Sequence, residues 1–232
     1  MCAAKKMPLD VREVMKAAAD TEAARSMLIS VCVYYDAQSP AELVELVRHA
    51  FDTRARNATV RVVPYEAGAS MMLPEADLAV LVAGLSSETG KLANDIRALG
   101  IPVLTVTTMP FIVKEQARAT GWALLEEDVV HPETSIDGGA LPPTSDFNQE
   151  PYPLTIDRQE SLLGRMGAWV VDTFREKRLA FALAFGFVRR PLSVEFVNAT
   201  AMQNAGIGLV VVIPGADMPV MTLNQAKMVL QI

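Results

Sequence analysis

Cysteine and histidine are scarce in this sequence, with two of each among 232 residues. Cys2 and Cys32 lie far apart and have no metal-binding or redox spacing, and neither His49 nor His131 has a cysteine or a second histidine nearby. A disulfide framework and a metal site are therefore not expected. Cys32 lies inside an apolar run, which predicts a buried thiol.

A glycine-rich phosphate loop is missing from the place where an α/β nucleotide-binding domain carries one, after the first strand. That loop is Asp36-Ala-Gln-Ser-Pro40, with no glycine, no lysine and a proline that removes an amide donor. The dinucleotide fingerprint G-x-G-x-x-G is also absent. We expect no bound nucleotide cofactor.

Two further catalytic signals are lacking. The fourth predicted strand ends in Thr107-Thr-Met-Pro110, where a GTPase would carry the Asn-Lys-x-Asp that reads guanine. The nucleophile elbow G-x-S-x-G occurs nowhere. GTP hydrolysis is not expected, and no catalytic residue is predicted.

Charged residues make up only 21% of the chain, and their signs are unevenly distributed. Residues 1–159 carry 14 basic and 22 acidic side chains, a net of −8, and residues 160–232 carry 7 and 5, a net of +2. An acidic first part argues against nucleic acid, which is bound through clustered Lys and Arg. The mixed charges of the first 26 residues contain no secretory signal, so a cytoplasmic location is expected, with association at the inner face of the cell membrane as an extension.

Apolar runs of strand length alternate with amphipathic segments in the first part of the chain. The runs are residues 26–35, 59–63, 76–85 and 101–107, and residues 122–125 are a candidate fifth strand. Helices are expected after an N-cap at Ser39, over 88–99 and over 114–120. This alternation predicts a GTPase-like, doubly wound, mostly parallel sheet of about five strands, followed by an all-α C-terminal module.

The predicted organisation has four parts: an N-terminal helix over 1–25, the α/β domain over 26–130, a linker rich in proline over 131–157, and a helical domain over 158–232. In the helical domain we expect one helix over 157–188, closed by Arg189-Arg190-Pro191, and a second from Ser193 to about 204. A last helix from Thr222 has no C-cap, which predicts that the chain continues past Ile232.

One segment is similar to a phosphate loop, Gly84-Leu-Ser-Ser-Glu-Thr-Gly90-Lys91, although it has one residue too many between its glycines. Either it is a polar loop in which a serine caps the next helix, or it is an anion or ligand site at the C-terminal edge of the sheet. The ligand-binding residues under the second interpretation are Asp36, Ser86, Ser87 and Lys91.

The C-terminal third carries a more specific signature: Phe187-Val-Arg-Arg-Pro191, Ile213-Pro-Gly-Ala-Asp-Met-Pro219 and Leu223-Asn-Gln-Ala-Lys-Met228. Residues 158–232 resemble the domain of unknown function 697 family, found in bacterial proteins associated with GTPases. The resemblance implies a helical, membrane-associated module without an assigned activity, next to a GTPase-related domain. The motif residues expected to be structural are Pro214, Gly215, Asp217, Asn224 and Gln225.

A membrane contact is also suggested by the residues themselves. Residues 196–216 carry no charge and are long enough to span a bilayer, but their Asn, Gln, Gly and Pro favour a buried hairpin or a membrane-surface helix. The basic residues that could face anionic lipid or a partner are Arg175, Lys177, Arg178, Arg189 and Arg190. The alternative is an ordinary exposed basic face.

Three functions remain open. The first is a non-catalytic regulatory or scaffold protein, in which a pseudo-GTPase-like domain joined to a membrane-associated helical module contacts a protein partner, such as a GTPase or a second copy of the chain. The second is a sensor or enzyme for a phosphorylated metabolite, using the edge of the sheet. The third is an integral membrane protein.

Overall fold

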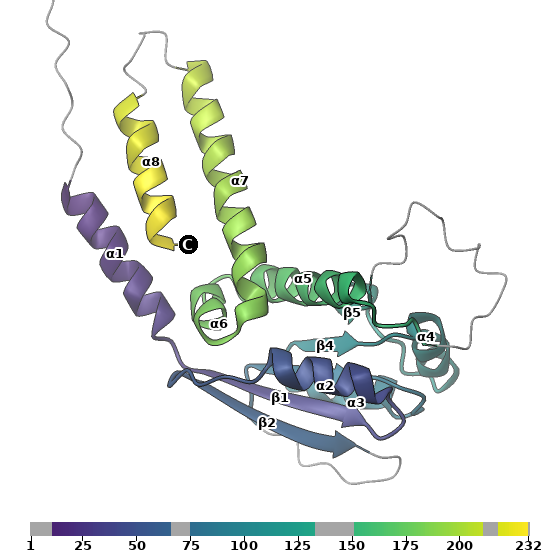
Figure 1. Ribbon diagram of the computed structural model, residues 1–232. Helices are drawn as coiled ribbons and strands as arrows, with labels where there is room; N and C mark the ends of the chain where they lie inside the picture. Colours follow the sequence, from purple (N-terminus) through teal and green to yellow (C-terminus); the bar gives the residue numbers. More distant parts are fainter. Residues whose placement is uncertain (1–10, 66–74, 133–150, 211–217, 232) are drawn as a thin grey trace, which may run out of the picture.

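A five-stranded parallel sheet forms the centre of the protein (Figure 1). The computed structural model describes residues 11–65, 75–132, 151–210 and 218–231. The strands are β1 (Ile29–Asp36), β2 (Ala58–Tyr65), β3 (Leu78–Val82), β4 (Val103–Val106) and β5 (Val129–Val130), in the order β2-β1-β3-β4-β5. All four pairings are parallel, which confirms the predicted α/β class and strand number.

Helices cover both faces of the sheet, because successive strand residues point to opposite sides. Ile29, Val31 and Val33 of β1 pack in a core with α2 (Ala41–Ala50), α5 (Ile156–Thr173) and α6 (Arg178–Ala184). Cys32 and Tyr34 of the same strand pack on the other side with α3 (Thr89–Ala98). α4 (Pro110–Ala119) lies against α3. The sheet is therefore doubly wound, as the alternation of elements predicts.

The first of these cores also contains residues far along the chain, such as Leu162, Met166, Phe181 and Phe196. The change from α/β to all-α sequence after residue 157 therefore marks a change of secondary structure within one continuous core. Tyr152, in the predicted linker, donates its backbone N–H to the carbonyl of Thr108 at 2.9 Å, so this end of the linker lies on the sheet.

Three helices stand together beyond the sheet. α7 (Gly186–Val210) begins beside α5, and its far end packs with α8 (Met218–Gln231), which in turn contacts α1 (Val11–Arg25). Figure 1 shows these three helices side by side, projecting away from the strands. We call α1, α8 and the part of α7 after Phe196 the helical arm.

Several predicted boundaries are wrong. The fifth strand is Val129–Val130 and not residues 122–125. The acidic residues 126–128 form a 3-10 helix, and the strand begins directly after it. α2 starts at Ala41 without a side-chain cap, since the Ser39 hydroxyl bonds the Val82 carbonyl instead.

The helix expected over 157–188 is two helices, α5 and α6, followed directly by α7. Pro191 does not end a helix, and Ser193 does not begin one, because both lie inside α7. Proline at the sixth position of α7 removes only the bond to the Phe187 carbonyl. That carbonyl faces α5, where Gly167 approaches so closely that a Cβ there would lie 2.5 Å from it.

Candidate functional site

The carboxyl ends of β1 and β3 flank the point where the strand order reverses. In open α/β sheets this switch point is where ligands bind, because loops leave in opposite directions and expose backbone amides. Asp36 is the last residue of β1, and the loop after β3 contains Gly84 and Ser86. A ligand-binding site is therefore expected between the loops that follow β1 and β3.

The switch point is occupied by the chain's own carboxylate. Asp36 is buried, with 3% of its surface exposed. One carboxylate oxygen accepts the backbone N–H of Gln38 at 2.9 Å, and the other accepts those of Ser86 at 2.8 Å and Gly84 at 3.2 Å. Three amides that would suit an anion are therefore bonded to a fixed internal anion.

Backbone packing closes the same crevice. A Cβ on Gly84 would lie 2.5 Å from the Ser39 nitrogen and 2.6 Å from the Gln38 carbonyl carbon, so the two loops touch main chain to main chain. The Ser39 hydroxyl adds a bond to the Val82 carbonyl at 2.9 Å. A phosphate loop needs an open ring of amides at this place, and here the loops are bonded to each other.

The four residues predicted to line a ligand site have different surroundings. Asp36 and Ser86 are buried and bonded to each other through the Ser86 amide, and the Ser86 hydroxyl accepts the Glu88 N–H at 3.2 Å, just ahead of α3. Ser87 and Lys91 are exposed. The contacts of Ser86 fit a polar loop, but the predicted capping is wrong: Glu88 precedes α3 and no side chain caps the helix, because the Ser86 hydroxyl bonds the N–H of Glu88 itself.

The end of β4 is also covered. Thr107 and Thr108 are buried, and the Thr107 hydroxyl accepts the Met109 N–H at 2.9 Å. The Thr108 carbonyl accepts the N–H of Tyr152, so the segment before α5 lies over this strand end. Pro110 then begins α4 in place of a polar, base-reading residue.

Three hydroxyl or thiol groups near the sheet are shielded from ionisation. Burial raises the pKa of Cys32, Tyr34 and Tyr65 above their ordinary values. The Tyr65 hydroxyl lies 2.9 Å from that of Thr89, which in turn bonds the Ser86 carbonyl at 3.1 Å. Buried groups that stay protonated are poor nucleophiles, so the arrangement does not favour covalent chemistry.

Three of the five residues of the predicted basic surface have internal partners. Lys177 donates to the Asp77 carboxylate at 2.6 Å and to the Leu28 carbonyl at 3.1 Å. Asp77 also accepts the Ser30 N–H at 2.8 Å, so Lys177 fastens the turn between α5 and α6 to the amino ends of β1 and β3.

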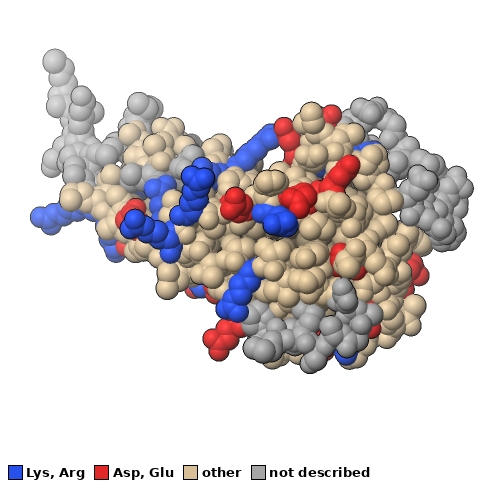
Figure 2. Space-filling view, turned by 60° about the horizontal axis from the view of Figure 1, so that its bottom comes forward, with Lys and Arg blue, Asp and Glu red and all other residues tan. Residues whose placement is uncertain are grey.

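The two other residues with internal partners are Arg178, the first residue of α6, and Arg189, near the start of α7. Arg178 pairs with Glu195 at 2.6 Å, and its guanidinium lies 4.7 Å from the centre of the Phe196 ring. Arg189 donates to the carbonyls of Ala182 and Leu183 at the end of α6. Arg175, Arg189 and Arg190 are exposed, and of these three Arg175 and Arg190 have no hydrogen-bond or ion-pair partner among the described residues. In Figure 2 Lys and Arg are most numerous toward the left of the view, and Asp and Glu are mixed with them over the rest of that face.

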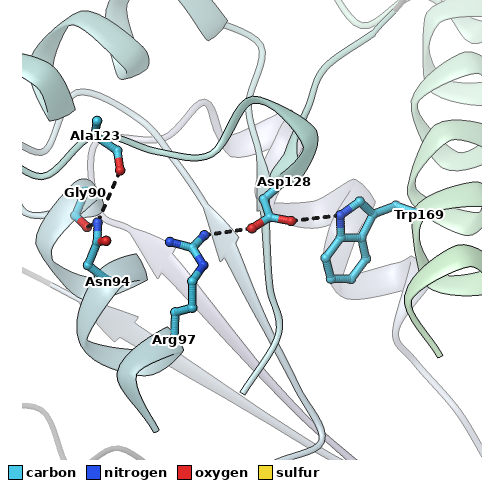
Figure 3. A network of polar contacts seen from close by, with 6 residues as sticks. All are labelled: Gly90, Asn94, Arg97, Ala123, Asp128 and Trp169. Carbon is cyan, nitrogen blue, oxygen red and sulfur yellow. Dashed lines mark hydrogen bonds and ion pairs between the residues drawn. The ribbon is translucent and has the colours of Figure 1, made fainter. Parts of the chain in front are cut away.

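A second polar network, at the β5 edge, was not predicted (Figure 3). Asp128 accepts from Arg97 of α3 at 2.7 Å and from the Trp169 indole of α5 at 3.2 Å, so one carboxylate joins helices from both faces of the sheet. Asn94, also on α3, donates separately to the carbonyls of Gly90 at 2.8 Å and Ala123 at 3.3 Å. The sequence feature at this place is the acidic run Glu126-Glu127-Asp128, a pattern that is typical of a solvated turn.

The helical arm carries the C-terminal motif. Asn224 of α8 donates to Asn204 of α7 at 3.2 Å, which joins the two helices, while Gln225 is exposed. Pro214, Gly215 and Asp217 lie outside the described residues. The arm's surface is apolar in places, since Met202 is 77% exposed and Met15 and Val229 are each 68% exposed.

The described parts of the chain contain neither a metal-binding cluster nor a membrane-spanning helix. No cluster of three or more His, Cys, Asp or Glu side chains in these segments could hold a metal ion. No helix within the described ranges, α7 included, is both long enough and apolar enough to cross a bilayer. Residues 211–216 of the candidate span lie outside those ranges.

Comparison with known proteins gives no relative, since no family model, no curated protein and no solved structure matches the chain. The class of protein rests on the fold, which is a doubly wound α/β fold with an all-parallel sheet. The resemblance of residues 158–232 to the domain of unknown function 697 family stays a prediction.

Proposed function

We propose that this chain is a non-catalytic regulatory or scaffold protein that acts through protein–protein contacts. The observation that carries the proposal is the Asp36 carboxylate, which holds the amides of Gln38, Gly84 and Ser86 at the switch point. A nucleotide phosphate would have to displace a buried anion that already has three donors, and it would meet negative charge there.

The helical arm is the part that we propose for partner contact. Residues 197–205 of α7 are almost all exposed and carry no charge, and Met202 projects from their middle. Uncharged, exposed helical surface with large apolar side chains is typical of interaction sites. The partner class that the sequence resemblance suggests is a GTPase, which would supply chemistry that the switch point of this domain lacks.

Calorimetry with GTP, GDP and ATP tests the first half of the proposal. We expect no binding at millimolar nucleotide, and a Kd below about 10 μM, equivalent to roughly −7 kcal/mol, would overturn it. The Asp36→Ala variant serves as the comparison, because it removes the internal anion without adding a side chain.

Site-specific photo-cross-linking in cells tests the second half. A photoreactive residue at position 202 should give a discrete adduct, whereas one at position 95, exposed on α3, should not. Adducts of equal yield at both positions, or at neither, would contradict a partner site on the arm.

A further inference from the structure

A groove of about 1090 Å³ lies between α2, α5 and α7. Its lining includes five apolar side chains from three helices: Leu46 of α2, Leu163 of α5, and Phe187, Pro191 and Val194 of α7. Val194 is 52% exposed. The groove is separate from the switch point, and it reaches the helical arm at Asn198.

Small residues on α5 keep the groove open. A Cβ placed on Gly164 would meet no atom within 4 Å, and Ala168, one turn further along α5, is exposed and also lines the groove. The neighbouring helices therefore do not close over this part of α5, and a ligand could contact it directly.

The charges around the groove are mostly negative. Its lining includes five carboxylates, from Asp52, Asp157, Glu160, Asp172 and Glu195, and two guanidinium groups, from Arg165 and Arg190. Arg165 is engaged in part, because it donates to the His131 carbonyl at 2.9 Å. A ligand with apolar contacts and positive flanks matches this lining.

One of these carboxylates has an unused buried oxygen. Glu195 accepts Arg178 through one oxygen at 2.6 Å, while the other oxygen is buried and has no donor among the described residues. Arg178 therefore does not satisfy the whole carboxylate, and Glu195, whose side chain is 42% exposed, adds negative charge to the wall of the groove.

The length of the groove fits a helix better than a small molecule. Asp157 and Asp172, which both line it, are fifteen positions apart on α5. At 1.5 Å per residue this is about 22 Å, the length of a helix of about 15 residues. Helix-in-groove binding uses apolar side chains at i, i+3, i+4 and i+7 along such a surface.

We propose that this groove binds a basic amphipathic helix of a partner protein, with its apolar face on α5 and α7 and its Lys or Arg side chains against the rim carboxylates. The inference rests on the proposed function, since it names a partner class for a protein that acts through contacts. Charge complementarity and the length of the groove select this occupant.

Fluorescence anisotropy with a labelled 15-residue peptide tests it. The probe has Leu at helical spacing with flanking Lys, and its control replaces every Lys by Glu. The intact protein should bind the Lys peptide with a Kd of about 10 μM or tighter, and the Glu peptide at least about tenfold more weakly. Equal binding of both peptides, or no binding, would overturn the proposal.

Three variants locate the binding. The double variant Glu160→Lys/Asp172→Lys reverses two negative charges at the rim of the groove. The variant Gly164→Leu places a side chain in the open space beside Gly164, where a Cβ meets no atom within 4 Å. Each variant should weaken binding of the Lys peptide about tenfold. Glu42→Lys/Glu127→Lys changes the net charge equally at exposed positions outside the groove and should alter Kd by less than about twofold. Equal losses in the two double variants would mean non-specific attraction and would overturn the site.

Analytical ultracentrifugation of the intact protein tests whether a second copy of the chain occupies the groove. A dimer that Glu160→Lys/Asp172→Lys dissociates would assign the groove to self-association and overturn the partner helix. The proposed function fails separately, through nucleotide binding, which none of these peptide measurements reports.

Discussion

The carbonyl oxygen of Phe187 in α7 would lie 2.5 Å from a Cβ on Gly167 of α5, so the two helices touch at a glycine. Pro191 supports this contact, because it has no N–H to bond the Phe187 carbonyl, and its Cγ would lie 2.9 Å from the same Cβ. Any side chain at position 167 must push α7 away from the core.

Two glycines on one helix therefore give opposite predictions. Gly167→Ala should destabilise the fold by about 2 kcal/mol or more, because the neighbouring atoms are backbone and proline. Gly164→Ala, whose Cβ meets nothing within 4 Å, should stabilise it by about 0.5–1 kcal/mol, since alanine loses less backbone entropy in a helix. Urea denaturation measures both, and the same sign for the two variants would contradict the packing described.

Asp36→Asn should cost about 2–3 kcal/mol of unfolding free energy. Asparagine has one acceptor oxygen, and its NH₂ group would face at least one of the three backbone donors that the carboxylate now satisfies. Asp95→Asn, on the exposed surface of α3, is the matched control and should change stability by less than about 0.5 kcal/mol. Comparable losses in the two variants would show that the buried bonds of Asp36 contribute little.

The ion pair between Lys177 and Asp77 should show a coupling energy of about 1 kcal/mol in a double-mutant cycle with Lys177→Met and Asp77→Asn. The pair is two-thirds buried, with side chains 34% and 29% exposed, and it ties α6 to the sheet. The exposed pair Arg48–Glu45, at 55% and 58%, gives the comparison and should couple by less than about 0.5 kcal/mol. A larger value for the exposed pair would contradict the ranking by burial.

Stability should fall with acidification through the titration of His131. Burial lowers the pKa of His131 below its ordinary value of 6.5, although its bond to the Pro132 carbonyl opposes the shift. Below pH 6.5 the unfolded chain therefore binds a proton that the folded chain resists, so stability is present above pH 6.5 and is lost as the pH falls toward the folded pKa.

Urea denaturation at pH 7.5 and pH 5.5 checks this pH dependence. The His131→Asn variant should lose less stability over this range than the parent protein. An unchanged pH dependence in His131→Asn would contradict the assignment to this residue.

The sequence predicts the sheet well, because the strands carry their own signal. β1 lies within the predicted run of residues 26–35 except for its last residue, Asp36, and β3 and β4 fall inside their predicted runs. Buried parallel strands are nearly continuous apolar segments, and glycines at 100 and 121, both with positive φ, end the helices where expected.

What the sequence could not predict depends on contacts between distant residues. β5 has only two residues, too short for any periodicity, and it is defined by its pairing with β4. α7 continues through Pro191 because the carbonyl that proline leaves without a bond packs against Gly167. Lys177 reads as part of a basic surface until the fold brings Asp77, one hundred positions away, within 2.6 Å.

The bonds of Asp36 have one more consequence, which concerns the number of states available to the domain. A ligand that is part of the chain has a very high effective concentration and cannot be diluted or exchanged. Conformational switches work because their ligand is present in one state and absent in the other. Because Asp36 holds these amides, the β1–β3 edge is occupied from within the chain, and a signal carried by an added ligand would have to enter through another surface.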